Sequence, residues 1–349
     1  MALNMYAGAK ALAEIKESGL SPKRISMMVG ASGGPKWLML CRLDQYLSEH
    51  FLNQAEQPIH LIGSSIGSWR MACYAQPDPL AAFKQFEDLY THQRYEKLTP
   101  AAISEYIDHV MDHLFADGVS QSIVDNPNRI LHVVAARNRR LFNSANKVVQ
   151  GVSIALAATL NMITSQAVEQ LYPRVVVSQG GTDAPYDGVK QTVQLTAANL
   201  KQALIASGAI PLVLAPSSIE GAKDRLHWDG GLVDYHFSGP FTVEDGLVFY
   251  PHFFPKVVPG WFDKALPWRR PKAEDYDNVV MLAPSQEFID SLPMGKIPDR
   301  TDFDKLSDED REAYWATVLT RTEELVDDFR TMMETDQGRS SVQSIEAIL

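Results

Sequence analysis

The chain has 349 residues, of which 45% are hydrophobic and 21% are charged. This balance is typical of a globular protein with a sizeable core, and the length suits one large α/β domain. The formal net charge of −11 argues against a nucleic-acid partner, because phosphate binding requires a basic surface. The sequence has no run of eighteen apolar residues, the length needed to span a membrane.

The N-terminal residues 1–20 carry Lys10 and Lys16 among apolar positions, which predicts an amphipathic helix and not a signal peptide. The two cysteines, Cys41 and Cys73, fall on predicted helices close to apolar neighbours. We interpret them as reduced core thiols, which suits a cytoplasmic protein.

The stretch Gly63-Ser64-Ser65-Ile66-Gly67 places a serine between two glycines where a strand is predicted to turn into a helix. The β-branched run 57–62 predicts a buried strand, and the run 68–74 predicts a helix. Glycine on either side lets the chains pass closely, and such a turn strains its central residue. We predict a nucleophile elbow, with the Ser65 hydroxyl at a helix N-terminus that favours developing negative charge. An ordinary glycine-flanked turn is the alternative.

A glycine-rich turn follows the predicted strand 25–29 and precedes a helix whose apolar side begins at Trp37. Successive N–H groups in such a turn can bind an anion. In an acyl-transfer enzyme, Gly33 and Gly34 would donate to the oxyanion of a tetrahedral intermediate, whereas Pro35 cannot donate. A structural turn and a phosphate loop are the alternatives, although the Gly-Lys-Ser/Thr of a phosphate loop is absent.

The later run His227-Trp228-Asp229-Gly230-Gly231 places an acid before two glycines. Asp-Gly between apolar segments is also a common hairpin turn, so the dipeptide alone says little. Among the Asp-Gly pairs of this chain, only that of Asp229 carries a second glycine, and it follows a predicted helix over 196–207.

These features, in this order, resemble the patatin-like phospholipases. The family's G-G-x-R/K loop, G-x-S-x-G elbow, A-S-x-A-x-P segment and D-G-G motif are matched at 33–36, 63–67, 206–211 and 229–231. The likeness covers about residues 25–235. The chain departs from the family pattern at Ser32 and Trp37, where the family often has glycine.

The resemblance implies a catalytic dyad in which Ser65 attacks an ester carbonyl and Asp229 accepts its proton and later activates water. A free aspartate has a pKa near 3.9, so Asp229 would need burial or hydrogen bonding to serve as a base. Two arrangements of Lys36 are open: an ion pair that holds the oxyanion loop in place, and a side chain that extends into solvent. The predicted supporting residues are the oxyanion-hole donors Gly33, Gly34 and Ile66, and the motif residues Gly63, Gly67, Lys36, Gly230 and Gly231.

A histidine base is the alternative. In the order of an α/β-hydrolase, His236 or His252 would follow Asp229. His227 lies two residues from Asp229 in a predicted strand, so the two would share a face. Against a triad, only two predicted strands precede Ser65, which is early for the elbow of that fold.

Strand and helix patterns alternate along the chain, which predicts an α/β fold of three layers, with a mainly parallel central sheet and helices on both faces. We predict one domain over 1–349, with a motif-bearing core at about 20–240 and an elaborated part over 241–349. We expect no metal site. Further predicted strands cover 129–135, 174–178, 247–250 and 278–282, and predicted helices cover 79–93, 100–115 and a long stretch from Ser307 towards Glu334.

The segment 252–272 contains five basic residues against one acid, four prolines and several large aromatics. This composition favours a lid or a patch that contacts anionic lipid at a membrane surface. The alternative is a proline-stiffened connection whose aromatics cover the core.

We predict a cofactor-free lipid acyl hydrolase of the phospholipase A, lysophospholipase or esterase type, acting on a lipid or other acyl ester. We expect it in the cytoplasm and peripherally at membranes. The alternatives are an acyltransferase that uses the same acyl-enzyme, and a non-catalytic lipid- or anion-binding protein.

Overall fold

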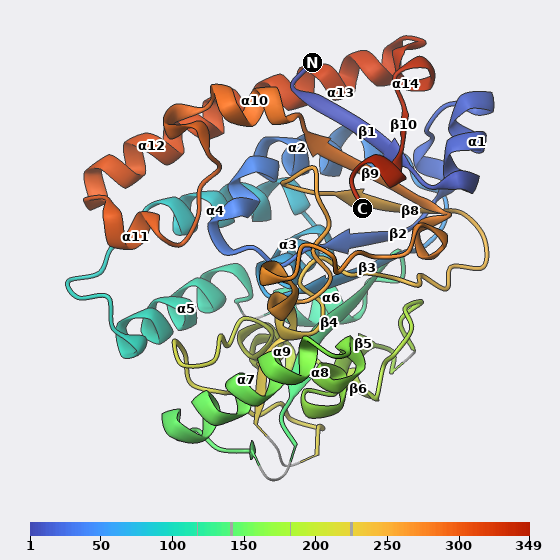
Figure 1. Cartoon of the computed structure of the whole chain (residues 1–349). Helices are drawn as coiled ribbons and strands as arrows, with labels where there is room; N and C mark the ends of the chain where they lie inside the picture. Colours follow the sequence, from blue (N-terminus) through green and yellow to red (C-terminus); the bar gives the residue numbers. More distant parts are fainter. Residues whose placement is uncertain (117, 140–141, 182, 224–225) are drawn as a thin grey trace.

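The computed structural model describes residues 1–116, 118–139, 142–181, 183–223 and 226–349. Its centre is one mixed sheet in which most neighbouring strands are parallel, with helices packed around it (Figure 1). The strand order is β10-β1-β9-β8-β2-β3-β4-β5-β6, and β7 pairs with β4 outside this path. The predicted α/β class with a mainly parallel sheet is confirmed.

The strands of the described residues are β1 (Leu3–Ala7), β2 (Ile25–Gly30), β3 (Ile59–Ser64), β4 (Arg129–Arg137), β5 (Arg174–Gln179), β6 (Gln191–Leu195), β7 (His227–Asp229), β8 (Leu247–Pro251), β9 (Val279–Pro284) and β10 (Gln343–Ser344). Their α-helices are α1 (Ala9–Ser18), α2 (Cys41–Tyr46), α3 (Ile66–Tyr74), α4 (Pro79–Thr91), α5 (Pro100–Leu114), α6 (Val119–Val124), α7 (Lys147–Asn161), α8 (Ser165–Leu171), α9 (Leu200–Ser207), α10 (Gln286–Ser291), α11 (Asp302–Lys305), α12 (Asp308–Arg321), α13 (Glu323–Glu334) and α14 (Gln337–Ser340). None of these helices combines the length and the apolar character needed to cross a bilayer.

The predicted strands 129–135, 174–178, 247–250 and 278–282 correspond to β4, β5, β8 and β9, and the helices predicted over 79–93 and 100–115 are α4 and α5. Thr99 caps α5, since its hydroxyl oxygen accepts a hydrogen bond from the N–H of Ala102 at 3.2 Å. Both cysteines are free and buried, as predicted.

The N-terminus differs from the predicted single helix. Residues 3–7 form β1, which pairs antiparallel with β9, and only residues 9–18 are helical. The charged residues that indicated a helix all lie within α1, whereas Leu3, Met5 and Ala7 are buried in the sheet. Three strands therefore precede Ser65 in the chain, and not two.

The predicted long helix after Ser307 is in fact two helices, α12 and α13, which meet at Thr322. The expected cap is present, because the Ser307 hydroxyl accepts from the N–H of Asp310 at 3.1 Å. The break lies where the buried Thr322 hydroxyl donates to the carbonyl of Leu319 at 2.7 Å. Such a local side-chain bond to the backbone competes with the helical hydrogen-bond pattern.

The C-terminal part of the chain completes the central sheet. β8 lies between β2 and β9, and β9 in turn pairs with β1, so strands from both ends of the sequence belong to one sheet. The single domain over 1–349 and its division near residue 240 stay predictions.

Three glycines allow β2, β3 and α3 to meet backbone to backbone. A Cβ atom on Gly67 would lie 2.0 Å from the carbonyl oxygen of Gly30, and one on Gly63 would lie 2.5 Å from the backbone of Gly67. Neither distance is sterically allowed, so this crossing accepts no side chain. It brings the carboxyl ends of β2 and β3 to the start of α3.

We expect Gly67→Ala to lower the free energy of unfolding by about 3 kcal/mol, because the new methyl group must push two backbone segments apart. Gly151→Ala in α7 is the matched control, since its Cβ would meet no heavy atom within 4 Å. That change should leave stability unaltered or raise it by roughly 0.5–1 kcal/mol. Urea unfolding measures both, and equal effects would contradict the packing argument.

Candidate active site

Ser65 occupies the turn between β3 and α3 with a φ of 53° and a ψ of −132°, a strained conformation for a residue with a side chain. Its hydroxyl donates a hydrogen bond to Oδ2 of Asp229 at 2.9 Å. Its backbone N–H donates to Oγ of Ser207 at 2.8 Å, and the Ser207 hydroxyl donates to the carbonyl of Val134 at 2.6 Å. The turn is therefore fixed from the side of α9 and β4.

Asp229 ends β7 and pairs with Ala135 near the carboxyl end of β4. Its Oδ1 accepts the N–H of Gly231 at 2.7 Å, while its own N–H donates to the carbonyl of Ala209 at 2.9 Å. The Asp-Gly-Gly motif forms the start of a 3₁₀ turn over Gly230–Leu232 and not a hairpin. Both carboxylate oxygens are thus engaged, one of them by Ser65.

Burial raises the pKa of Asp229 to about 6. The N–H of Gly231 and the hydroxyl of Ser65 act in the opposite direction, as do the positive charges of Arg300 and Lys264. Asp229 is only 7% exposed, so desolvation of its charged form outweighs these contacts. The result is a carboxylate that exchanges a proton near neutral pH.

The segment after Asp229 is anchored by a buried ion pair. Asp234 accepts from Arg174 of β5 at 2.8 Å, and the carbonyl oxygen of Asp234 accepts from the Ser64 hydroxyl at 2.5 Å. Both charged groups are buried, and a buried charge is stable only when it is paired with an opposite charge. This pair fixes the Asp-Gly-Gly turn against the elbow.

The predicted oxyanion loop lies beside the elbow. Gly34 has a φ of 56° and lines the same cavity as Ser65 and Ile66, whereas Gly33 does not line it. Within the described residues, the N–H groups of Gly33, Gly34 and Ile66 have no hydrogen-bond acceptor. Two of the three predicted donors therefore border the space in front of the Ser65 hydroxyl.

Ser32 connects the loop to the elbow. Its hydroxyl lies 2.6 Å from that of Ser64, and its N–H donates to the carbonyl of Tyr235 at 2.9 Å. A serine in place of the glycine often found in the family thus supplies a hydrogen bond that holds the loop.

Lys36 follows neither of the two expected arrangements. It is half-buried, with its ammonium group 5.6 Å from the ring centroid of Phe253. No carboxylate lies within ion-pair distance of Lys36 in the described part of the chain. Desolvation lowers the pKa of this lysine.

A cavity of about 500 Å³ opens at Ser65. This volume is in the range of small-molecule sites. Its wall includes α5, the segment after α9, and residues within 90–98 and 300–304. Its apolar lining includes Trp69, Ile103, Ile107, Val110, Ile210 and Leu214.

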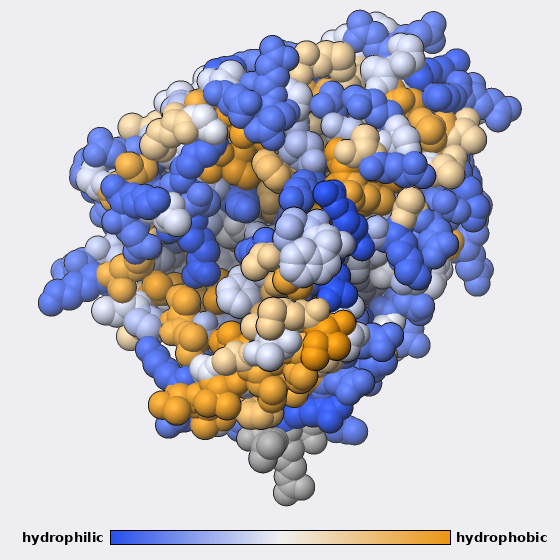
Figure 2. All heavy atoms as spheres, in the orientation of Figure 1, coloured by the Kyte–Doolittle hydropathy of each residue, from blue (hydrophilic) through white to orange (hydrophobic). Residues whose placement is uncertain are grey.

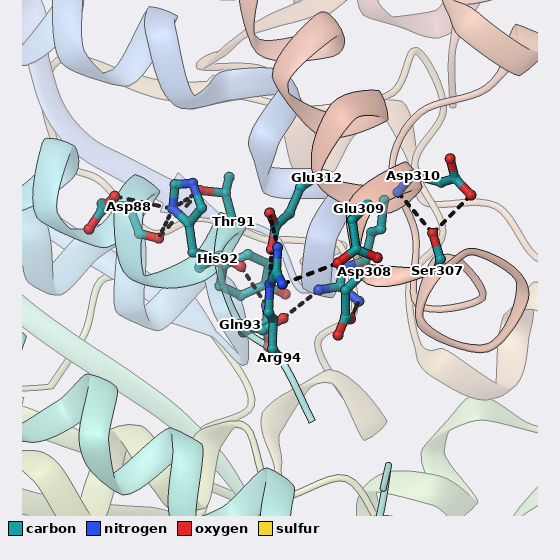
Figure 3. A network of polar contacts seen from close by, with 12 residues as sticks. Asp88, Thr91, His92, Gln93, Arg94, Ser307, Asp308, Glu309, Asp310 and Glu312 are labelled. Atoms are coloured by element: carbon teal, nitrogen blue, oxygen red, sulfur yellow. Dashed lines mark hydrogen bonds and ion pairs between the residues drawn. The ribbon is translucent and has the colours of Figure 1, made fainter. Parts of the chain in front are cut away.

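Polar contacts join the segment after α4 to residues of helix α12 (Figure 3). Gln93 and Tyr95, which follow α4, line the cavity, and Arg94 between them pairs with Glu312 at 2.8 Å. The buried Arg311 donates to the carbonyl of Gln93. The exposed Arg94 pair contributes little stability, so the buried contact of Arg311 is the stronger constraint on this wall.

The structure does not bring a histidine to Ser65. Among the described residues, the Ser65 hydroxyl has no histidine within hydrogen-bond distance. Nδ1 of His236 accepts from the N–H of Val258 at 3.0 Å, and the His252 ring contacts the backbone of Phe254. Burial lowers the pKa of His252 to about 3 and holds that of His236 well below its usual range. His227 is buried on β7, and burial lowers its pKa to about 4.

Sequence reasoning missed two residues at the site, Ser207 and Arg300. Ser207 lies inside the predicted Ala-Ser-x-Ala-x-Pro segment, so a signal for it was present. Arg300 lines the cavity, and its Cγ lies 3.4 Å from the position of a Cβ atom on Gly34. No motif marks Arg300, because the recognisable pattern ends before residue 240.

We expect Asp229→Asn to stabilise the fold by about 2 kcal/mol at pH 8. The folded-state pKa of about 6 exceeds the unfolded value near 3.9, so the carboxyl group favours folding when protonated. This contribution is complete below about pH 4 and is lost as the pH rises through 6. The advantage of the variant should therefore vanish at about pH 4 in urea unfolding. The exposed Asp304→Asn is the control, and a pH-independent difference would contradict the account.

A model of one protein family, the patatin-like phospholipases, matches residues 46–236. No curated protein matches the chain. The matched range contains Ser65 and Asp229 and covers more than half of the sequence. The mixed, mostly parallel sheet is the architecture expected for this family. The chain therefore belongs to the patatin-like phospholipase family of lipid acyl hydrolases.

Proposed function

We propose that this protein hydrolyses the carboxylic ester of a lipid through an acyl-enzyme on Ser65, with Asp229 as the general base. The observation that carries this proposal is the 2.9 Å hydrogen bond to a buried Asp229 from the strained Ser65, which lines an apolar cavity. Strain of this kind is stored at functional sites and costs stability elsewhere. The strain at Ser65 therefore favours a catalytic role over the alternative of a non-catalytic binding protein.

In the first half of the reaction, the Ser65 oxygen attacks the ester carbonyl and its proton passes to Asp229. The N–H groups of Gly34 and Ile66, with Gly33 as the third predicted donor, stabilise the oxyanion of the tetrahedral intermediate. When the intermediate collapses, the leaving alcohol takes the proton from Asp229. Asp229 next removes a proton from water, which attacks the acyl-enzyme to give a second tetrahedral intermediate. When this intermediate collapses, the Ser65 oxygen takes the proton back from Asp229 and the fatty acid is released.

The pKa of about 6 supports Asp229 in this role, because a base works best when its pKa lies near the working pH. The depressed pKa values of His236 and His252 and their bonds to the backbone support a histidine base less well. The apolar cavity would hold the acyl chain. An acyltransferase would use the same dyad, with an alcohol in place of water.

We further propose that the protein works in the cytoplasm and contacts membranes peripherally through 252–272 and α7. Within 252–272, Phe253 and Phe262 are buried, as a core-covering segment requires, whereas Trp261 and Trp268 are 42% and 67% exposed. The 3₁₀ turn Trp261–Ala265 packs against α7.

α7 presents an apolar stripe to solvent, formed by Val148, Val152 and Leu156 at intervals of four residues. Figure 2, in the orientation of Figure 1, shows apolar side chains gathered over α7. Exposed Leu212 donates its N–H to Gln150 of α7, and its neighbours in the chain line the cavity, so this surface reaches the cavity wall. The sequence has no acidic residue between Asp125 and Glu169, and 252–272 is basic. An apolar and basic surface on an acidic protein suits anionic lipid.

We expect Ser65→Ala to lower kcat/KM for a lipid ester by about 10³-fold or more, because it removes the nucleophile. Asp229→Asn should also lower it strongly. In the wild type, kcat/KM should rise with pH through an apparent pKa near 6, since Asp229 accepts a proton only when ionised. Ser18→Ala, at an exposed serine, is the control. An unaltered rate in Asp229→Asn would argue for another base.

Replacing Trp261 and Trp268 with Ala should weaken binding to anionic vesicles and keep turnover of a soluble short-chain ester. The physical reason is the loss of two large side chains from the membrane-facing surface. Met294, which is 56% exposed and outside both segments, provides the control variant Met294→Ala. Unchanged co-sedimentation of the double variant with vesicles would refute the peripheral contact through 252–272.

A further inference from the structure

Three basic side chains near the dyad or its oxyanion loop have no carboxylate partner among the described residues. They are Arg300 at the cavity wall, Lys264 in the turn after β8, and Lys36 in the oxyanion loop. In the described part of the chain, none of them lies within ion-pair distance of an acid. This contrasts with their neighbour Lys296, which pairs with Asp299 at 2.9 Å and with Asp302 at 2.6 Å.

Of these three residues, Arg300 borders the cavity. It lines the cavity together with Ser65, and its aliphatic stem packs against Gly34 of the oxyanion loop. Its guanidinium group is exposed and has five N–H donors, a number suited to phosphate or carboxylate oxygens. An anion bound by Arg300 would lie at the wall of the cavity that Ser65 also lines.

Lys264 lies in the 3₁₀ turn Trp261–Ala265, and its charge acts on Asp229. Its ammonium group lies 3.8 Å from the ring centroid of Tyr235, the residue before His236 in the sequence. Desolvation lowers the pKa of Lys264 to about 8, and the charge of Lys36 adds to this effect. Like charges held together in this way are unfavourable, and a bound anion would relieve the repulsion.

The acids that face this group are few. Asp229 belongs to the dyad, Asp299 is paired with Lys296, and exposed Asp304 lines the cavity without an ion pair in the described residues. Lys36, Lys264, Arg300 and Lys296 thus face Asp229, Asp299, Asp302 and Asp304, so the two signs balance around the dyad, although the whole protein carries a net charge of −11.

We propose that Arg300 and Lys264 bind an acidic oxygen group of the substrate beside the ester that Ser65 attacks, so that acyl esters with a net negative charge are preferred over neutral and zwitterionic ones. This inference rests on the proposed function. Both residues lie outside the range that the family model matches, residues 46–236, so the C-terminal part of this chain supplies the selectivity.

The test compares three lysolipids with the same acyl chain: a monoacylglycerol, its 3-phosphate and its 3-phosphocholine ester. For the wild type, kcat/KM should be highest for the 3-phosphate. Arg300→Gln and Lys264→Gln should each lower the preference for the 3-phosphate over the monoacylglycerol about tenfold, mainly through KM, the size expected for one charge-assisted hydrogen bond. Arg300→Lys should recover part of the preference. Lys84→Gln, at an exposed lysine of α4 outside both the cavity and 252–272, should keep it.

Binding to Ser65→Ala separates this inference from the proposed function. Calorimetry should show the 3-phosphate binding more tightly than the monoacylglycerol, and the additional change Arg300→Gln should remove the difference. Equal binding of the two lipids would overturn this inference and leave the proposed function standing. So would a preference for the 3-phosphate that survives both Arg300→Gln and Lys264→Gln. A folded wild type that binds the 3-phosphate selectively and hydrolyses none of the three lipids would instead overturn the proposed function.

Discussion

The close approach of backbone segments at Gly30, Gly63 and Gly67 is the constraint on which the site depends. Because α3 can begin in contact with the ends of β2 and β3, the chain must turn sharply at Ser65, and the side chain is directed out of the turn. The same crossing places the loop after β2 next to the nucleophile. A strained residue, a glycine-rich loop and the start of a helix thus come together from one packing requirement.

A second constraint is the cost of burying Asp229. The fold encloses this carboxyl group between β4, the elbow and the turn after β7, and its charged form loses hydration there. The hydrogen bonds from Gly231 and Ser65 offset only part of that loss. The cost in stability and the suitability of Asp229 as a base therefore have one cause, the desolvation that raises its pKa.

Much of this architecture follows from local sequence patterns. Glycine spacing around Ser65 and the alternation of strands and helices indicated the elbow and the sheet, because both depend on short-range chemistry. The strand β1 was missed, since only its pairing with β9 buries it. Arg300 was missed because its place beside Gly34 arises from tertiary packing of the C-terminal part. The depressed pKa values of His236 and His252 likewise depend on burial. The positions of the nine histidines in the sequence do not show which of them are buried.

Labelling with a fluorophosphonate, followed by mass spectrometry of the intact protein and its peptides, tests the central claim most directly. The probe reports on the activated serine itself and needs no knowledge of the natural lipid. The account predicts one adduct per chain, located on Ser65, absent in Ser65→Ala and formed much more slowly in Asp229→Asn. Labelling at an unchanged rate in Asp229→Asn, or no labelling of the folded wild type, would contradict a Ser65–Asp229 dyad.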